Sequence, residues 1–120
     1  MQFDGTNEYI EKKSKFYGFL IKNATEEKIK EGLEFLKKEH KKATHICYAY
    51  SVSSPFVEKA VDDGEPSGTA GRPILSVIQK SGSKDVCVFI VRYFGGIKLG
   101  AGGLVRAYTK VTSTLLKENK

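Results

Sequence analysis

Hydrophobic residues recur at helical spacing after Thr25. Ile29, Leu33, Leu36 and His40 stand at positions i, i+4, i+7 and i+11, so they share one face of a helix. Thr25 offers an N-cap oxygen, and the two glutamates that follow it suit the positive end of a helix dipole. The pattern predicts an amphipathic helix that begins after Thr25 and reaches His40.

Two further segments have a helical pattern. Between Thr69 and Gln79 apolar residues occupy one side, and Pro73 requires the helix to begin close by, because proline is tolerated in the first turn. A final helix follows a glycine-rich loop, with cations on one face and apolar residues on another. Its apolar face is made by Leu104, Tyr108, Val111 and Leu115.

Shorter apolar runs predict the strands. Residues 8–14 and 15–21 suit one bent edge strand or a tight pair, and residues 45–52 and 56–61 suit a hairpin. We place the middle of the sheet at this hairpin. Residues 86–91 are apolar without alternation, which is typical of a strand covered on both faces. The order of elements predicts an α+β fold in which helices pack on one face of a mostly antiparallel sheet.

Composition narrows the class of protein. The chain has 120 residues, enough for one domain with a single core, and 20 Lys and Arg against 14 Asp and Glu give a formal charge of +6. Either this positive charge attracts anionic partners such as RNA, DNA or nucleotides, or the protein is basic without binding any of them. The apolar runs are too short for a membrane span, and residues 1–5 lack the charged and apolar regions of a signal peptide, so we expect a cytoplasmic protein.

Cysteine and histidine usage gives little sign of a metal centre. Cys47 and Cys87 lie in apolar strands, where a free thiol behaves as a small buried hydrophobe. His40 and His45 stand apart from them, without the closely spaced pairs of a zinc site. We expect no cofactor, no bound metal and no catalytic residue, since no Ser/His/Asp or Cys/His arrangement is recognisable.

The segment Arg92–Tyr108 carries a glycine-rich loop between a strand and a helix. Such a loop places backbone N–H groups and a helix N-terminus at one point, which suits an anion. Neither the Walker A nor the dinucleotide fingerprint is complete, and the glycines could instead serve positive φ angles and close packing. The glycines are Gly95, Gly96, Gly100, Gly102 and Gly103.

An acidic cluster precedes the middle helix. Asp62, Asp63 and Glu65 are close enough in sequence to hold Mg²⁺, to pair with arginines, or to act as ordinary turn residues. We favour the turn or the arginine pairing over a metal.

Four segments resemble those of a known family. Residues 62–73 and 91–108 resemble the two signature segments of the Impact family, and residues 12–16 and 43–50 are similar to its other two recurrent segments. The resemblance implies a fold like domain 2 of ribosomal protein S5. It also implies that residues 1–120 form a single N-terminal-type domain, without the ferredoxin-like C-terminal domain of two-domain relatives.

The resemblance sets the functional expectation. Eukaryotic members act in translational control by binding a regulatory protein, and nucleic-acid or ribosome-linked binding is suggested for bacterial members. We therefore expect a non-enzymatic binding module of translation control or the stress response, which contacts RNA or a ribosome-associated protein, in an oligomeric state that the sequence leaves open. The alternative is a Mg²⁺-dependent enzyme acting on a nucleotide or a phosphorylated small molecule.

The expected binding residues surround the glycine-rich loop. The five glycines shape it, Asp62, Asp63 and Glu65 orient the arginines, and Tyr93 offers a stacking platform. A further possibility is that partners bind the cations of residues 37–42, although a helix C-terminus also favours cations. The expected phosphate or carboxylate contacts are Arg72, Arg92, Lys98, Arg106 and Lys110.

Overall fold

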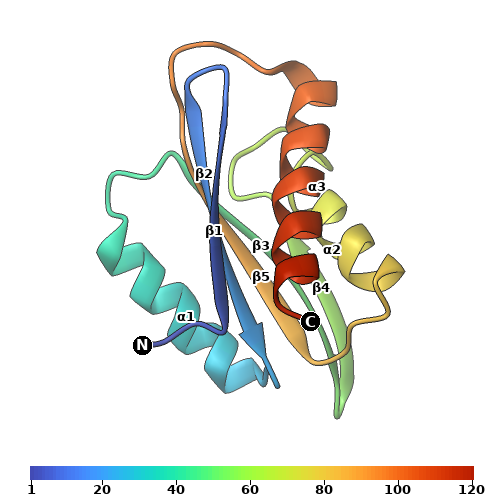
Figure 1. The fold of residues 1–120 in the computed structure, drawn as a ribbon. Coiled ribbons are helices and arrows are strands. Elements are labelled where there is room, and N and C mark those ends of the chain that lie inside the picture. Colours follow the sequence, from blue (N-terminus) through green and yellow to red (C-terminus); the bar gives the residue numbers. More distant parts are fainter.

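The computed structural model describes residues 1–120 as a five-stranded antiparallel sheet with three helices (Figure 1). The strands lie in the order β1-β2-β5-β3-β4, and every neighbouring pair is antiparallel. The predicted α+β class is therefore confirmed. The elements are β1 Gly5–Glu11, β2 Ser14–Lys22, α1 Glu26–Glu39, β3 His45–Ser53, β4 Phe56–Val61, α2 Gly71–Lys80, β5 Val86–Tyr93 and α3 Gly100–Glu118.

The middle of the sheet is β5, so its predicted position at the β3–β4 hairpin is wrong. β4 is an edge strand, whereas β5 pairs with β2 on one side and β3 on the other. Residues 86–92 of β5 are all buried. A strand with neighbours on both sides and cover on both faces has no exposed positions, which explains its unbroken apolar sequence.

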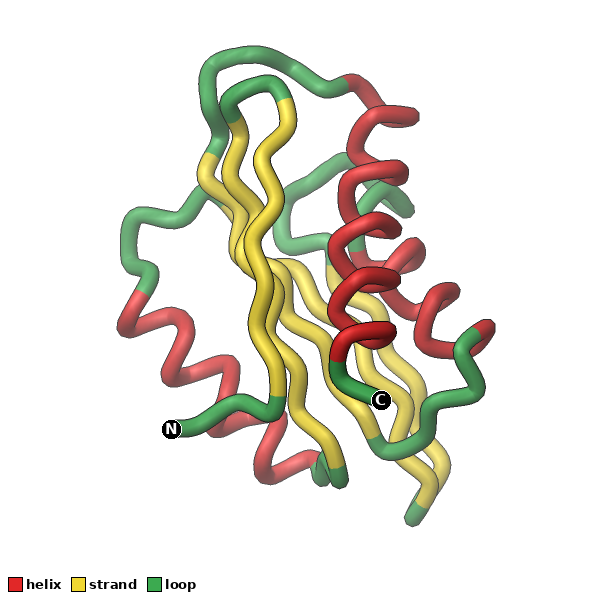
Figure 2. Tube along the Cα trace, in the orientation of Figure 1, coloured by secondary structure: helices red, strands yellow, loops and turns green.

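Helices cover both faces of the sheet (Figure 2), so the prediction that they share one face is also wrong. Val88 and Ile90 of β5 belong to the core cluster that α2 and α3 complete. Phe89 and Val91, which alternate with them, belong to a second cluster with Leu36 of α1. A central strand that is apolar on both faces requires cover on both, and α1 supplies the second cover.

The first two strands form a tight pair. Lys12 and Lys13 make the two-residue turn between them, with φ angles of 46° and 66°. Positive φ at both positions is what a type I′ hairpin turn requires. A Cβ at Gly95 would overlap the Lys13 carbonyl, so the turn and the glycine-rich loop lie against each other, as their positions in Figure 1 also show.

Local residues mark where each helix begins. The Thr25 hydroxyl accepts a hydrogen bond from the Lys28 amide at 3.2 Å, which confirms the predicted N-cap of α1. α2 begins at Gly71, with Pro73 in its first turn as predicted. α3 begins at Gly100, so the last three glycines of the loop form its first turn.

Candidate binding surface at one end of the sheet

The antiparallel order brings distant segments together. β2 and β3 begin at the same end of the sheet at which β5 and β4 end, because neighbouring strands run in opposite directions. The N-terminus of α3 lies at this end too, which is the upper end in Figure 1. The segments that meet there are 12–16, 43–50, 62–73 and 91–108.

A buried ion pair lies beneath this end. Arg92 and Glu65 are 5% and 7% exposed, and Arg92 Nη1 donates to both carboxylate oxygens of Glu65 at 2.9 and 2.8 Å. Tyr108 Oη donates to Glu65 Oε2 at 2.5 Å, and His45 Nε2 lies 3.4 Å from Oε1. Arg92 Nη2 donates to Ser14 Oγ at 3.2 Å. Through these contacts the Arg92–Glu65 pair joins α3 to the start of β2, the start of β3 and the end of β5.

Burial limits what these two residues can do. The Arg92 guanidinium faces Glu65 and Ser14 and also lies over the rings of Phe16 and Phe94, at 5.4 and 5.6 Å from their centroids. Burial also raises the pKa of Tyr108, which keeps its hydroxyl protonated as a donor to Glu65. Arg92 therefore positions its neighbours from below, with little surface for a ligand.

The other two carboxylates bind backbone amides. Asp62 accepts from Gly68 at 2.9 Å and from Ala70 and Gly71 at 3.2 and 2.9 Å, so it caps the start of α2. Burial by itself would raise the pKa of Asp62, but these amides outweigh it and hold the pKa below its usual value. Asp63 Oδ2 accepts from the Ile46 amide at 2.7 Å.

The acidic cluster does not fit a Mg²⁺ site. Its three carboxylates face different partners, whereas a magnesium site needs oxygens that converge on one point. No group of three or more His, Cys, Asp or Glu side chains in the chain is arranged to hold a metal ion.

The N-terminus of α3 lacks a capping side chain. Leu99 is its N-cap residue, no side chain accepts from the first-turn amides, and the first turn has no acidic residue. Gly96 and Gly100 have φ angles of 93° and 74°, which other residues rarely adopt. A Cβ at Gly102 would lie 3.3 Å from Arg106 Nη1, so the Arg106 guanidinium lies over this first turn. The positive end of the helix dipole therefore faces solvent with a cation beside it.

A cleft of about 420 Å³ opens at this helix N-terminus. We call it the glycine-loop cleft. Its walls are residues 64–66 of the β4–α2 loop and residues 98–101 at the start of α3, with Arg92 at its base and Phe94 at its edge. Lys98, one of the predicted contacts, is exposed on its wall.

A second cleft of about 420 Å³ lies on the other side of Phe94. Tyr93 Oη is 2.6 Å from His40 Nδ1, and the Tyr17 ring lies parallel to the His40 ring within 27° and edge-on to Tyr93. Phe94 is 46% exposed and lines both clefts. We call this second one the aromatic–lysine cleft, and its lining is Lys13, Lys15, Tyr17, His40, Tyr93 and Phe94.

Sequence reasoning found Tyr93 but missed the other members of the aromatic–lysine cleft. Lys15 pairs directly with Tyr93 in the β2–β5 ladder, and Tyr17, two residues further on, points to the same face. The alternation of β2 placed Lys15 and Tyr17 on one face, but only the strand pairing brings them to Tyr93. His40 joins them from the end of α1.

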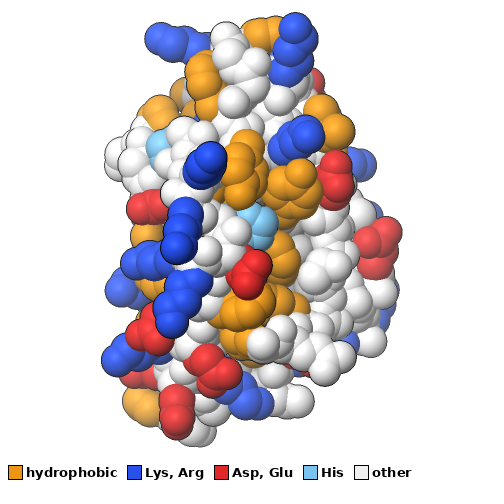
Figure 3. Space-filling model, turned by 90° about the vertical axis from the view of Figure 1, so that its left-hand side faces the viewer, with side chains coloured by type: hydrophobic (Ala, Val, Ile, Leu, Met, Phe, Trp, Pro, Cys, Tyr) orange, Lys and Arg blue, Asp and Glu red, His pale blue; other side chains and the backbone are white.

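The remaining predicted cations are spread over the surface. Arg72, Arg106 and Lys110 are exposed, and none of them lines either cleft. Among the exposed lysines of residues 37–42, Lys37 and Lys38 lie in the last turn of α1, and Lys41 and Lys42 follow its C-cap residue His40. Figure 3, which views the molecule from the side of α1, shows basic side chains gathered beside a band of hydrophobic ones.

Comparisons with known proteins identify the family. The profile of the Impact N-terminal domain matches residues 12–116, and the chain belongs to the Impact family. It is 50% identical to the IMPACT family member YvyE of Bacillus subtilis, over 91% of this chain and 51% of that protein. It is 42% identical to YigZ of Escherichia coli, over 81% of this chain and 49% of that protein. The chain thus spans about half the length of these curated relatives.

Solved structures share the fold. A crystal structure of a hypothetical protein is 37% identical and superposes with a TM-score of 0.91, over 97% of this chain and 58% of that one. The two-domain translational regulator Yih1 is 24% identical with a TM-score of 0.64, over 96% of this chain and 45% of that one. None of the helices in the structure is long and apolar enough to cross a membrane.

Proposed function

We propose that this domain is a non-enzymatic binding module of translation control, and that it binds single-stranded RNA where its two clefts meet. Membership of the Impact family and the shared fold with the translational regulator Yih1 support the role in translation control. The observation that carries the RNA proposal is Phe94, an exposed ring between a cleft of aromatic and lysine side chains and a cleft at an uncapped helix N-terminus.

The aromatic–lysine cleft has the features of a single-strand site. Such sites combine aromatic rings, on which bases stack, with cations that follow the backbone. Tyr93, Phe94 and Tyr17 supply the rings, and Lys13 and Lys15 supply the cations. Because stacking surfaces are available to every base, we expect little sequence preference.

The glycine-loop cleft would hold the adjoining phosphates. Lys98 is on its wall, and the free amides at the start of α3 favour anions. In this arrangement Glu65 and Arg92 hold the two clefts in place from below rather than touching the RNA. Arg106 adds a positive charge beside the start of α3. Arg72 and Lys110 contribute only to the positive electrostatic potential of the whole protein.

The test is binding of a fluorescein-labelled oligouridylate, followed by anisotropy across a salt series. Phe94→Ala should weaken binding by about 5- to 150-fold, the range for loss of one stacked base. Phe56→Ala is the matched control, because Phe56 is 70% exposed at the far end of β4, and it should leave the affinity unchanged.

Charge is tested separately. The Lys13→Ala/Lys15→Ala pair should lower the slope of log affinity against log salt by roughly 0.7 for each lost phosphate contact. Lys30→Ala/Lys59→Ala removes the same charge from exposed positions outside both clefts and should leave the slope unchanged. Absence of salt-dependent binding by the wild type would overturn the RNA proposal and favour a ribosome-associated protein as the occupant.

A further inference from the structure

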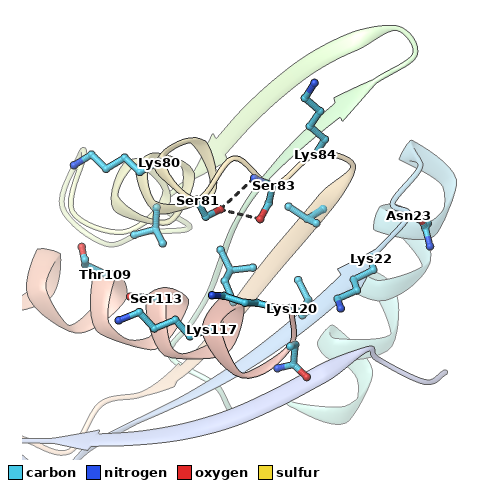
Figure 4. A pocket seen from close by; sticks show the side chains of 15 residues that line it. Lys22, Asn23, Lys80, Ser81, Ser83, Lys84, Thr109, Ser113, Lys117 and Lys120 are labelled. Atoms are coloured by element: carbon cyan, nitrogen blue, oxygen red, sulfur yellow. Dashed lines mark hydrogen bonds between the residues drawn. The ribbon is translucent and has the colours of Figure 1, made fainter.

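A cavity larger than either cleft lies at the opposite end of the sheet from them. Its volume is about 650 Å³, and it opens between the second half of α3, the α2–β5 loop and the end of β2 (Figure 4). We call it the lysine-rimmed cavity. Small-molecule sites in proteins have volumes of about 300–1,000 Å³, so its size suits a ligand of that class.

The lining has an apolar floor and a basic rim. Leu20, Val77, Val86 and Leu116 are its hydrophobic members. Hydroxyl and amide side chains complete the lining, among them Ser83 after α2 and Ser113 of α3. The cationic members are Lys22, Lys80, Lys84, Lys117 and Lys120.

None of these lysines forms an ion pair within the chain. No Asp or Glu lines the cavity, and the ion pairs of the chain, both of which involve Glu65, include none of the five. Asp85, the acid next to Lys84 in sequence, accepts hydrogen bonds from the amide and hydroxyl of Ser53 instead. Five lysines without an ion-pair partner around one opening give it a positive potential that attracts anions.

Helix dipoles explain only part of this rim. Lys80 and Lys117 lie in the last turns of α2 and α3, where cations stabilise the negative end of a helix. Lys22 ends β2, and Lys84 belongs to the α2–β5 loop, so neither has a helix end to stabilise. Stabilisation of helix dipoles therefore does not account for Lys22 and Lys84.

Hydrogen bonds order the polar residues that stand beside the lysines. Ser81 Oγ lies 2.7 Å from the Ile78 carbonyl oxygen and 2.8 Å from Ser83 Oγ, and the Ser83 amide donates to Ser81 Oγ at 3.3 Å. Across the opening, Asn119 Nδ2 donates to the Leu115 carbonyl at 2.8 Å. The segments that carry the lysines are therefore ordered before a ligand binds, which lowers the entropy cost of holding it.

We propose that the lysine-rimmed cavity binds a small organic phosphate whose apolar part rests on the floor while the lysines hold the phosphate groups. Lysine acts on phosphate as a flexible point charge, and serine and threonine hydroxyls supply further donors. The site is separate from the RNA surface and does not depend on it, since the two share no lining residue.

The test uses 1-anilinonaphthalene-8-sulfonate as a fluorescent anion with an apolar ring, and ATP and pyrophosphate as competitors. The probe should bind saturably and be displaced by ATP at lower concentration than by pyrophosphate, because ATP also covers the floor. No saturable binding, or no displacement by either competitor, would overturn the proposal. If ATP and pyrophosphate displaced the probe at equal concentrations, the proposed contact between the ligand and the apolar floor would be refuted.

Two variants locate the binding. Lys84→Ala/Lys117→Ala should weaken displacement by ATP about tenfold or more, as loss of two hydrogen bonds of ordinary net strength does. Lys30→Ala/Lys59→Ala, with the same change of charge outside the cavity, should match the wild type. Ser113→Trp fills the opening without changing charge and should abolish ATP binding while RNA binding persists. Wild-type ATP affinity in the two cavity variants, with urea midpoints showing that both are folded, would place the ATP elsewhere and overturn the proposal.

Discussion

Replacing Glu65 by leucine removes the acceptor of a buried cation. The Arg92 guanidinium, 5% exposed, would lose both of its contacts with the carboxylate, and the Tyr108 hydroxyl would lose its acceptor. Arg92 Nε already has no partner, so little else remains for this guanidinium than Ser14. The change therefore leaves a charge in the core with almost no compensation.

The cost follows from that burial. Removal of one partner of a buried ion pair costs about 3–5 kcal/mol, a large share of the roughly 5–15 kcal/mol that stabilises a domain. For a chain of this length 1 kcal/mol corresponds to about 4 °C, so Glu65→Leu should lower Tm by about 12–20 °C. Arg92→Met should have a similar cost, because it leaves the Glu65 carboxylate buried.

The double variant separates charge from packing. Glu65→Leu/Arg92→Met removes both charges, and such replacements are often neutral, so its cost should be only about 1–2 kcal/mol from the lost partners of Tyr108 and Ser14. The assay is urea unfolding of all four proteins, with Glu34→Leu on the exposed face of α1 as a surface control. If the two single costs added to the double cost within about 0.5 kcal/mol, the pair would not be energetically coupled and the reasoning would be refuted.

Three further results are expected. Gly95→Ala should destabilise the domain by about 1–3 kcal/mol, because its Cβ would overlap the carbonyl of the β1–β2 turn, whereas Gly102→Ala in the first turn of α3 should be neutral or stabilising in the same urea assay. The pKa of Asp62 is lower in the folded than in the unfolded protein, so its carboxylate stabilises the native state above pH 3.8, and this contribution is lost as the pH falls further. Asp62→Asn should therefore flatten the loss of stability below pH 4, as measured by acid titration followed by circular dichroism. Burial raises the pKa of Cys47 to about 12 and that of Cys87 well above its usual value. Neither thiol should therefore react with Ellman's reagent at pH 8 until urea unfolds the protein. Fast reaction of the native protein would contradict this burial.

The candidate site shows where sequence reasoning stops. The segment between β5 and α3 has positive φ angles at Gly96 and Gly100, as its glycines suggest, and its role in binding stays a prediction. Arg92 looked like a surface cation because cations flank the loop, yet it ends the central strand with its side chain beneath the surface. Charge alone does not tell a buried cation from an exposed one, since a partner 27 residues away along the chain decides it.

The lysine-rimmed cavity illustrates the same limit. In the sequence, Lys80 and Lys84 flank the small residues 81–83, and Lys22 follows the predicted strand 15–21, with no pattern that joins the three lysines. They meet because antiparallel pairing brings the end of β2 beside the start of β5, and α3 packs its last turns over the same place. Periodicity within an element carries no information about such contacts between elements.

The amino-acid sequence by itself determined the local structure of this protein. Helical and strand periods, the Thr25 cap, Pro73 and the glycines act within a few residues, where backbone sterics and hydrogen bonds decide the conformation. Only the tertiary structure decided that β5 is the middle strand, that helices cover both faces and that Arg92 is buried. Those outcomes depend on how distant apolar faces are buried together, a free energy shared by the whole chain that no single segment contains.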